Sequence, residues 1–528
     1  MLNLIMLAAL AQQTAPTGVA LTRDRMDQQA PTTPTGKRIP DGTATVTVSG
    51  SNQPIRGITF KGAQAPIEVA KAAEKFIGRP ATKQTLVELA GALSRAYEHS
   101  NVALYTITIP EQSFKEGVVF VSLTEGWIKS AKVKTANGRP LTLVQAQADR
   151  MVGQKPLSRR RMERQFSLMR AIPGLKLDTK FENPNHDEAV DLVLDAKQRR
   201  SQFFVGIGNR GPDLVGDLVL QAGANFYGLA TQGDKLSFSA ASTRNPHRYR
   251  QLGGTYSAPL NADGLSLTAN VATVRTGVRA FGTTIKGRAR LAGVSLTYPI
   301  IREFERSADI SVGIDGVNSN NAAFGNTISS ERSRAVRLAG SYVAANKKRT
   351  ISGSAILSQG LDAFGARITY PLADANFRKL SVNAGYEQAI GKRAFARLNA
   401  SAQYSPDKLP GAELYSVGGA SIGRAFDTGF LTGDSGAGGV LELAYRPLGG
   451  STFDKTEVYA FTDAAKLTVH KRGPFPGQRY DMASAGLGTR LRYKEKIELG
   501  VEGAKVVNKP YPAYRDDWRL SFYYNLSL

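Results

Sequence analysis

Short amphipathic segments fill the chain from about residue 200 to its end, and they limit its possible folds more than any other feature. Each runs for about ten residues with apolar and polar side chains in alternation, a period typical of strands in outer-membrane β-barrels. Gly, Asn, Asp and Pro turns separate the segments. A soluble β-sandwich is the alternative, but its strands are usually shorter and fewer. The pattern therefore favours a membrane barrel.

The last segment, residues 517–528, strengthens this interpretation because its two faces differ sharply. Arg519, Ser521, Tyr523, Asn525 and Ser527 share one face, and Trp518, Leu520, Phe522, Tyr524, Leu526 and Leu528 share the other. A final amphipathic strand lets a barrel close without leaving an unpaired edge. There are about 16 such segments, at a spacing that is ordinary for outer-membrane barrels. We therefore predict an all-β membrane domain, a 16-stranded transmembrane β-barrel over residues 199–528.

The region before the barrel shows a β-α-α-β-β unit twice in tandem. The first copy covers residues 53–126, and its second helix is predicted to begin at Thr85, with Thr85 and Glu88 as a capping box. The second copy covers residues 127–198, and its second helix opens with the basic run 158–164. That run is either a solvated helix face or a surface that steers a substrate. A tandem repeat of this kind indicates two small α/β domains.

The N-terminus has the composition of an export signal followed by a linker. Residues 1–11 are mostly apolar and end in Ala9-Leu10-Ala11, as the cleavage site of a secretory signal would, although a positively charged start is missing. We interpret them as the remnant of a signal peptide. Residues 12–52 are rich in Thr, Pro, Gln and Gly, which predicts a linker with at most a short helix around Leu21–Gln29.

Composition argues against several classes of function. The net charge is +24, but Lys and Arg are scattered and form no dense basic patch with interleaved aromatic residues, so we expect no nucleic-acid partner. The chain has no cysteine, which removes disulfides, thiol catalysis and Cys-ligated metals. Its four histidines lack metal-ligand spacing, and neither a phosphate-binding loop nor a nucleophile elbow is present. We expect no catalytic activity, no metal and no cofactor.

A glycine-rich stretch at residues 414–445 interrupts the barrel pattern with a long loop that carries one arginine, Arg424. A loop this long inside a regular series of strands is usually functional or disordered. On the strand that follows, Glu457 and Asp463 share a face, which should be the lumen because a carboxylate facing lipid is unfavourable. We predict that a loop at residues 405–436 folds into the lumen, where Arg424 forms a bidentate ion pair with Asp463. The alternative is a solvated loop arginine.

The order of these parts resembles the outer-membrane transporters of two-partner secretion, the hemolysin secretion/activation (ShlB/FhaC/HecB) family. Three passages carry the resemblance, which covers about residues 53–528. They are Pro110, Gln112, Gly117, Glu125 and Gly126 in the first repeat, Gly423-Arg424-Ala425-Phe426 with Asp434 in the loop, and Phe461-Thr462-Asp463 after it. The family's loop tip is commonly Val-Arg-Gly-Tyr/Phe, so the glycine here lies on the other side of the arginine.

The resemblance implies a fold, a location and a function. The repeats would be POTRA domains in the periplasm, and the barrel would lie in the outer membrane in contact with its lipid, as a monomer. Gly423, Arg424, Phe426, Asp434, Phe461 and Asp463 would lock the loop to the barrel. The partner would be an unfolded exoprotein, a large β-helical adhesin or hemolysin, captured by the POTRA domains and secreted through the barrel.

Two other functions stay open. A BamA-type insertase, which assembles outer-membrane proteins, belongs to the same superfamily but usually carries more POTRA domains. A passive porin-like channel would leave the two repeats without a role.

Overall fold

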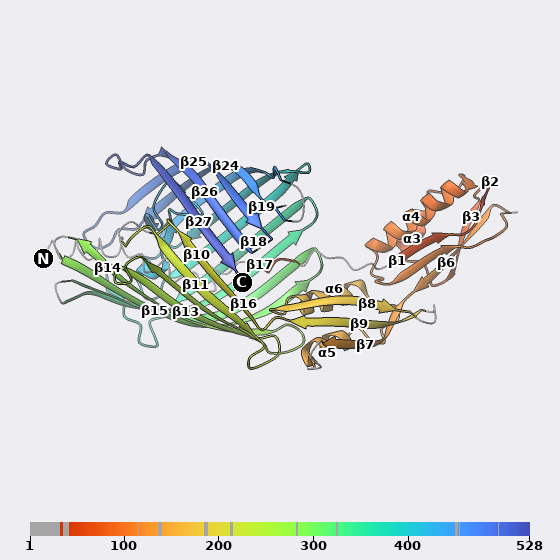
Figure 1. Ribbon diagram of the computed structural model, residues 1–528, viewed down its shortest axis with the longest axis horizontal. Helices are drawn as coiled ribbons and strands as arrows, with labels where there is room; N and C mark the ends of the chain where they lie inside the picture. The colour runs from red at the N-terminus through yellow and green to blue at the C-terminus, as the bar shows by residue number, and fades with distance from the viewer. Residues whose placement is uncertain are drawn as a thin grey trace. The chain divides into compact units, whose positions relative to one another are not determined.

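The computed structural model describes residues 32–34, 42–114, 116–135, 140–183, 188–211, 215–280, 283–323, 326–448, 452–453, 455–494 and 496–528. The chain divides into two compact units (Figure 1). The first contains residues 199–301 and 305–528 together with the described residues before 35. The second runs to residue 198 and includes Arg302–Phe304. The predicted signal remnant, and a helix around Leu21–Gln29, lie outside the described residues.

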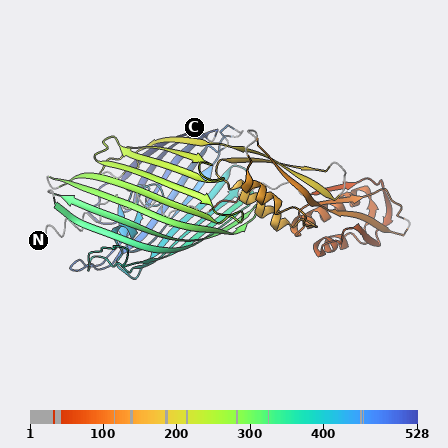
Figure 2. The ribbon, with the colours of Figure 1, turned by 90° about the horizontal axis from the view of Figure 1, so that it is seen from below.

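The first unit is a closed antiparallel barrel of 16 strands, as predicted. Its strands are β10 (Ser201–Gly208), β11 (Val219–Tyr227), β12 (Lys235–Thr243), β13 (Tyr249–Pro259), β14 (Ser266–Ala280), β15 (Thr283–Arg302), β16 (Arg306–Ala323), β17 (Asn326–Ala345), β18 (Arg349–Gly360), β19 (Arg378–Ile390), β20 (Ala394–Tyr404), β23 (Ser435–Tyr445), β24 (Glu457–Val469), β25 (Gln478–Tyr493), β26 (Ile497–Asn508) and β27 (Trp518–Ser527). They run obliquely around the barrel (Figure 2). The last strand, β27, pairs with β10 from Phe204↔Ser527 to Gly208↔Tyr523, and this seam closes the sheet.

Alternation along each strand separates an outward apolar face from the lumen. In β27 the side chains of Trp518 and Leu520 are 67% and 68% exposed, whereas that of Ser521 between neighbouring apolar residues is buried. In β24, Val458 is exposed and Glu457 and Asp463 are buried, so the carboxylates face the interior, as the alternation predicts. The apolar faces are thereby directed to lipid and the polar faces to the lumen.

The second unit contains both α/β repeats. The first consists of β3 (Gly57–Gly62), α3 (Ile67–Glu74), α4 (Lys83–His99), β5 (Tyr105–Ile109) and β6 (Val118–Glu125), and a short pair of strands, β2 (Gly50–Pro54) and β4 (Pro80–Thr82), flanks it. The second consists of β7 (Trp127–Thr135), α5 (Thr142–Asp149), α6 (Arg159–Arg170), β8 (Leu175–Glu182) and β9 (Ala189–Gln198). In each repeat the third strand pairs between the first and the second, so the two share one topology. Within the described residues, no helix has the length and apolar character needed to cross a bilayer.

An additional strand extends the sheet of the first repeat. β1 (Gly42–Val46) pairs in parallel with β5, and Val46 and Val48 pack against the core of this repeat. The linker predicted for residues 12–52 is therefore wrong at its C-terminal end. The sequence pattern did not indicate this strand, because it is only five residues long and most of its side chains are exposed. Its pairing with β5 is through the backbone.

Helix α4 begins earlier than predicted. Its N-cap is Thr82, whose side-chain oxygen accepts a hydrogen bond from the Thr85 N–H at 3.3 Å. The predicted capping box of Thr85 and Glu88 is therefore not formed, and Glu88 instead pairs with Arg79 at 2.5 Å. Thr82 adopts the extended conformation of an N-cap because it is also the last residue of β4.

Backbone and arginine contacts join the two repeats. The Gly126 N–H donates to the Leu104 carbonyl at 2.8 Å, and the Leu157 N–H donates to the Gly126 carbonyl at 3.1 Å. The Arg159 guanidinium donates to carbonyls at the end of α4, those of Tyr97, Ser100 and Val102, at 3.1–3.3 Å. The first arginine of the basic run thus binds the neighbouring repeat, while Arg160 and Arg161 remain exposed.

Candidate functional site

A loop between β20 and β23 folds into the barrel. It contains a 3₁₀ turn, η2 (Gly411–Glu413), and two short strands, β21 (Tyr415–Val417) and β22 (Leu431–Gly433), which pair only with each other among the described strands. The side chains of Arg424, Phe426 and Asp434 are buried although they lie on a loop. The loop predicted at residues 405–436 therefore folds into the lumen, but it ends at residue 434, because β23 begins at Ser435. A solvated position for Arg424 is ruled out.

The tip of the loop is held through its backbone. The Gly423 and Arg424 N–H groups donate to the two carboxylate oxygens of Asp463 at 2.9 and 3.1 Å, and the Ser484 hydroxyl donates to both at 2.8 Å. Gly423 has φ +79°, and a Cβ there would lie 2.6 Å from the Met482 methyl carbon. Only glycine suits this position, which explains why the glycine precedes the arginine in this chain.

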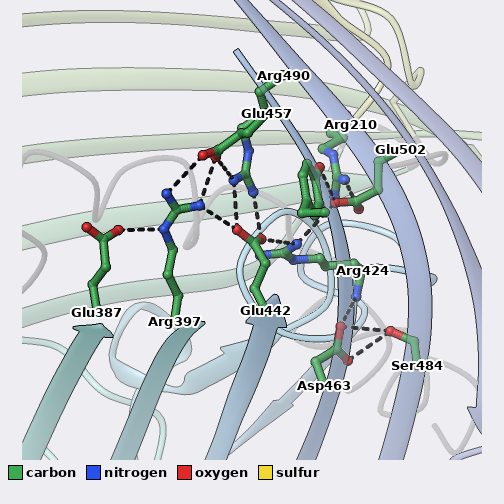
Figure 3. A network of polar contacts seen from close by, with 11 residues as sticks. Arg210, Glu387, Arg397, Arg424, Glu442, Glu457, Asp463, Ser484, Arg490 and Glu502 are labelled. Carbon is green, nitrogen blue, oxygen red and sulfur yellow. Dashed lines mark hydrogen bonds and ion pairs between the residues drawn. The ribbon is translucent and has the colours of Figure 1, made fainter. Parts of the chain in front are cut away.

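The Arg424 guanidinium does not pair with Asp463, so the predicted bidentate pair is wrong. Its Nη1 donates to Glu442 at 3.2 Å and to Glu502 at 3.1 Å (Figure 3). The Arg424 Cζ lies 4.5 Å from the centre of the Phe461 ring. Backbone amides and Ser484 already saturate Asp463, so the side chain extends past it to the next carboxylates. Asp463 thus positions the tip, and Arg424 links it to β23 and β26.

Arginine and glutamate side chains extend this contact along the barrel wall. Glu442 also accepts from Arg397 at 2.9 Å and from Arg490 at 2.7 Å, and Glu457 accepts from the same two arginines at 2.8 and 2.7 Å (Figure 3). Each side chain is ordered once but contacts several partners, so the conformational-entropy cost per ion pair is lower. The additional contacts also offset part of the desolvation cost of the buried charges. The lumen wall is therefore a preorganised polar surface to which the loop tip is joined.

The tip also contacts the strands of the seam. Asp427 forms an ion pair with Arg519 of β27, and the Thr428 hydroxyl donates to the Arg210 carbonyl, directly after β10, at 2.6 Å. Arg210 in turn pairs with Glu502 at 2.5 Å. Both strands that close the barrel are thus bound by neighbouring residues of the loop.

Aromatic packing holds the remainder of the tip. The Phe426 ring is fully buried, with centroids 5.4 Å from Phe430 and 5.2 Å from Tyr514. Tyr514 lies in the connection between β26 and β27. The tip therefore also has apolar contacts, with the connection that leads into β27.

Asp434 fixes the point where the loop returns to the barrel. Its carboxylate accepts from the Leu409 and His470 N–H groups at 2.7 and 2.8 Å and pairs with Arg472 at 2.6 Å. Asp434 therefore joins both ends of the loop to the connection after β24.

A second ion cluster binds the limb of the loop to a different part of the wall. Glu413 pairs with Arg337 of β17 at 2.9 Å and with Lys379 of β19 at 2.7 Å. Arg337 is fully buried and also pairs with Asp315 of β16 at 2.5 Å. The loop is therefore tied to two arcs of the barrel, β16–β19 and β23–β26.

The motif residues of the first repeat have mainly structural contacts. Gln112 exchanges hydrogen bonds with the Phe120 backbone at 2.7 and 2.9 Å, and its Nε2 lies 3.3 Å from the Pro110 carbonyl. Gly117 has φ +70°, and a Cβ there would meet the Pro54 carbonyl at 2.7 Å. These contacts shape the turn before β6.

Glu125, the motif residue at the end of β6, is held in a partly buried position. It accepts a hydrogen bond from the Tyr97 hydroxyl at 3.1 Å. Burial raises the pKa of the Glu125 carboxyl; the Tyr97 hydrogen bond opposes this shift, and the charge of Glu188 adds to it.

Several residues of the site were missed by sequence reasoning. Glu442, Glu502 and Glu413 carry the ion pairs, yet none belongs to a motif. The alternation of side chains along each strand could have indicated Glu442 and Glu502, because a carboxylate on a barrel strand is expected to face the lumen. Within the described ranges, no set of three acidic or histidine side chains could hold a metal ion.

Comparison with known proteins identifies the family. The family model of the haemolysin secretion/activation protein ShlB/FhaC/HecB matches residues 189–491, more than half of the chain. The chain belongs to this family. The model of the ShlB-type POTRA domain matches residues 53–126, so the first repeat of this ShlB/FhaC/HecB-family transporter is a POTRA domain. The second repeat shares its topology.

Curated relatives are distant but belong to the same class of protein. The outer membrane transporter CdiB of Escherichia coli is 29% identical over 138 residues, which are 25% of this chain and 24% of CdiB. The aligned part is thus about a quarter of that relative's length. The heme/hemopexin transporter protein HuxB of Haemophilus influenzae strain 86-028NP is 21% identical over 388 residues, 70% of this chain and 67% of HuxB.

Solved structures show the same fold over nearly the whole chain. CdiB from Escherichia coli superimposes with a TM-score of 0.68 at 18% identity, over 99% of this chain and 98% of CdiB. BamA from Haemophilus ducreyi lacking POTRA domains 1–3 gives 0.56 at 15% identity, over 90% of this chain and all of that one. The barrel of this ShlB/FhaC/HecB-family member therefore has a BamA-like fold.

Proposed function

We propose that this chain captures an unfolded exoprotein at its POTRA domains and secretes it through the barrel, as a monomer and without catalysing a reaction. The observation that carries the proposal is a lumen whose wall is polar and whose passage is occupied by a loop held through discrete, breakable contacts. A polar wall suits an extended polypeptide, and the membership of the ShlB/FhaC/HecB family supports such a cargo.

The repeats are proposed to lie in the periplasm. The two longest connections of the barrel, 361–377 and 405–434, lie at one end, and the three-residue connections 303–305, 346–348 and 391–393 lie at the other. Outer-membrane barrels place short turns in the periplasm and long loops outside the cell. The first barrel strand begins at the end with short turns, directly after the second repeat.

Capture is proposed to use strand edges of the POTRA sheets. An extended segment adds to an exposed edge through backbone hydrogen bonds and needs little sequence identity, which suits an unfolded cargo. The parallel addition of β1 to β5 supports this mode, because it places an extended segment from outside the repeat on the same sheet.

The test is secretion of a candidate β-helical exoprotein from the same organism, co-expressed with this chain in a bacterial host. Deletion of residues 42–198 should leave a folded barrel in the outer membrane and no exoprotein in the medium. The insertase function predicts instead that depletion of the intact chain lowers the level of other outer-membrane proteins. Secretion that persists with the deleted form would refute capture by the POTRA domains.

A further inference from the structure

A row of arginines crosses the outward face of the barrel near the ends of β13, β14 and β15. Arg250 lies directly opposite Arg275, and Arg275 lies directly opposite Arg288. All three are exposed, as are Arg290 and Lys286 on the same strand face as Arg288. Ala289 and Leu291 between them are buried, so the cations point away from the lumen.

This arrangement is unfavourable unless an anion accompanies it. Like charges directly opposite each other on neighbouring strands destabilise a sheet, and the charges of Arg290, Arg275 and Arg250 all act on Arg288. The described part of the outward faces of β13–β15 carries no Asp or Glu that could neutralise them. An anion from outside these strands would supply the missing counter-charge.

An apolar groove lies next to the row on the same face. Its volume is about 940 Å³, and Leu252, Val271, Val294 and Ile314 line it. The depression exists because Val271 lies between Gly254 of β13 and Ala292 of β15, which offer almost no side chain. These large apolar residues are 36–60% exposed, on the face that lipid covers.

Two cations border the groove. Arg290 and Arg334 contribute to its lining, as does the exposed ring of Phe364. Arg334 is oriented by hydrogen bonds to Asn318 Oδ1 at 2.9 Å and to the Phe364 carbonyl at 3.2 Å. A ligand here would meet apolar side chains along the strands and guanidinium groups at one end.

We propose that this surface binds a phosphate-bearing lipid of the outer leaflet, with an acyl chain in the groove and its phosphate on Arg275, Arg288 and Arg290. Guanidinium groups match phosphate through paired, charge-assisted hydrogen bonds. The row lies at the end of the barrel with the long connections, so its assignment to the outer leaflet rests on the orientation proposed above.

The test is native mass spectrometry of the full-length protein in detergent, with lipid A as the probe. The variant Arg275→Gln/Arg288→Gln/Arg290→Gln should bind lipid A about tenfold more weakly, since several charge-assisted contacts are lost. Lipid A without its phosphates should bind the wild type as weakly. The variant Ala292→Phe, which fills the groove and keeps the arginines, should also lose affinity.

A matched control removes three outward cations from the same end of β24–β26. Lys466→Gln/Arg479→Gln/Lys505→Gln changes the charge equally, but Lys466 already faces Asp481 across the ladder. Its affinity for lipid A should stay at the wild-type value. Each variant is first checked for heat-modifiable migration in electrophoresis, which reports a folded barrel.

Three results would overturn the proposal. They are equal binding by the arginine variant and the control, phosphatidylglycerol bound as tightly as lipid A, and displacement of lipid A by poly-glutamate, which would assign the row to an acidic polypeptide. Lipid binding in detergent does not involve the exoprotein. A negative result in the lipid-binding experiment can therefore be distinguished from a negative result in the secretion experiment.

Discussion

Asp463 and Arg424 have separate tasks at the tip of the loop. The carboxylate accepts backbone N–H groups and so fixes the shape of the tip, whereas the guanidinium carries charge to Glu442 and Glu502. Neither residue can take over the other's contacts. Their substitution should therefore have effects that a simple ion pair would not show.

Exchange of the two charges tests this division. Arg424→Asp and Asp463→Arg should each lower the temperature at which the barrel unfolds in detergent, since loss of one partner from a buried polar network costs about 3–5 kcal/mol. The double exchange should restore nothing. Ser484→Ala removes the hydroxyl that donates to Asp463 and accepts from the Ala425 N–H, and it should cost less, about 1–3 kcal/mol. Recovery in the exchanged protein would contradict these assignments.

Period-2 alternation was sufficient to direct Asp463 into the lumen, because a strand offers only two faces. It could not show which group would reach the carboxylate, because that depends on the path of a loop with several positive-φ glycines. The partner of Arg424 was therefore wrong although its location was right.

Glu125 should make the first repeat depend on pH. Its pKa is raised by burial in the folded state, so the folded repeat binds more protons than the unfolded chain. Protonation of Glu125 therefore stabilises the folded repeat at a pH below the ordinary carboxyl pKa. This contribution to the free energy of unfolding is lost as the pH rises through the raised pKa of the folded state.

Glu125→Gln should remove this loss and raise the unfolding temperature of the repeats at neutral pH, because the amide keeps an acceptor for the Tyr97 hydroxyl. Helical circular dichroism of the full-length protein, followed on heating between about pH 4 and pH 8, provides the measurement. The exposed Glu111→Gln is the control. A larger stability gain at low pH than at neutral pH would show that the sign is wrong.

At the scale of elements, the loop tip acts on the seam between β10 and β27. Asp427 binds Arg519 on one side, and Thr428 binds the Arg210 carbonyl on the other. The seam has only five paired positions, fewer than the nine between β26 and β27. The loop therefore reinforces the shorter junction.

Asp427→Ala with Thr428→Val should let the seam open more often. The chain has no cysteine, so a pair introduced at Val205 and Leu526, directly opposite across the seam, can report it. Oxidation should join this pair in a disulfide several-fold more slowly in the loop variant, because opening separates the two strands. A pair at Leu338 and Leu357 of β17 and β18 should not change. Equal rates at the seam in the wild type and the loop variant would show that the loop does not stabilise the closed barrel.

The junction of the two repeats depends on Arg159, which binds three carbonyls of the first repeat. Each bond from a charged donor contributes about 1.5–3 kcal/mol. Arg159→Ala should therefore broaden the distance distribution between spin labels at Lys75 and Lys176, one in each repeat. Arg160→Ala, at an exposed neighbour, should leave it unchanged. A narrow distribution in both would show that the backbone contacts are sufficient.

In the whole molecule, two ion clusters hold one loop to two arcs of the barrel. Glu413 binds β17 and β19, and Arg424 binds β23 and β26. With either cluster intact the loop still has a buried anchor, so it should remain across the lumen. Loss of both leaves the contacts of Asp434, Asp463 and Phe426, so the loop should leave the lumen more often than in either single variant.

Conductance in planar bilayers checks this expectation. Glu413→Gln and Arg424→Gln should each raise the open-channel current slightly, and the double variant should raise it by much more than the sum. Glu498→Gln changes a charge of the barrel that contacts Tyr523 and not the loop, and it should have little effect. Additive changes would show that the two clusters act independently.

The architecture of the molecule was largely predictable, and its interior was not. The number of strands follows from apolar residues with period 2, and the helices of the two repeats follow from apolar residues with period 3.6. Each pattern extends over many residues, so a local irregularity does not hide it. The pairing of Glu413 with Arg337 joins residues far apart in sequence, and no local pattern encodes it. Strand β1 escaped notice because its contacts are mainly between backbones.

The origin of β1 has a practical consequence for work on isolated domains. The family match begins at residue 53, yet the fourth strand of that sheet and two valines of its core come from residues 42–48. A fragment cut at residue 53 would expose the whole backbone edge of β5 to any neighbour. Such a fragment would associate with copies of itself. Its measured affinity for other polypeptides would reflect the newly exposed edge of β5, which β1 covers in the intact protein.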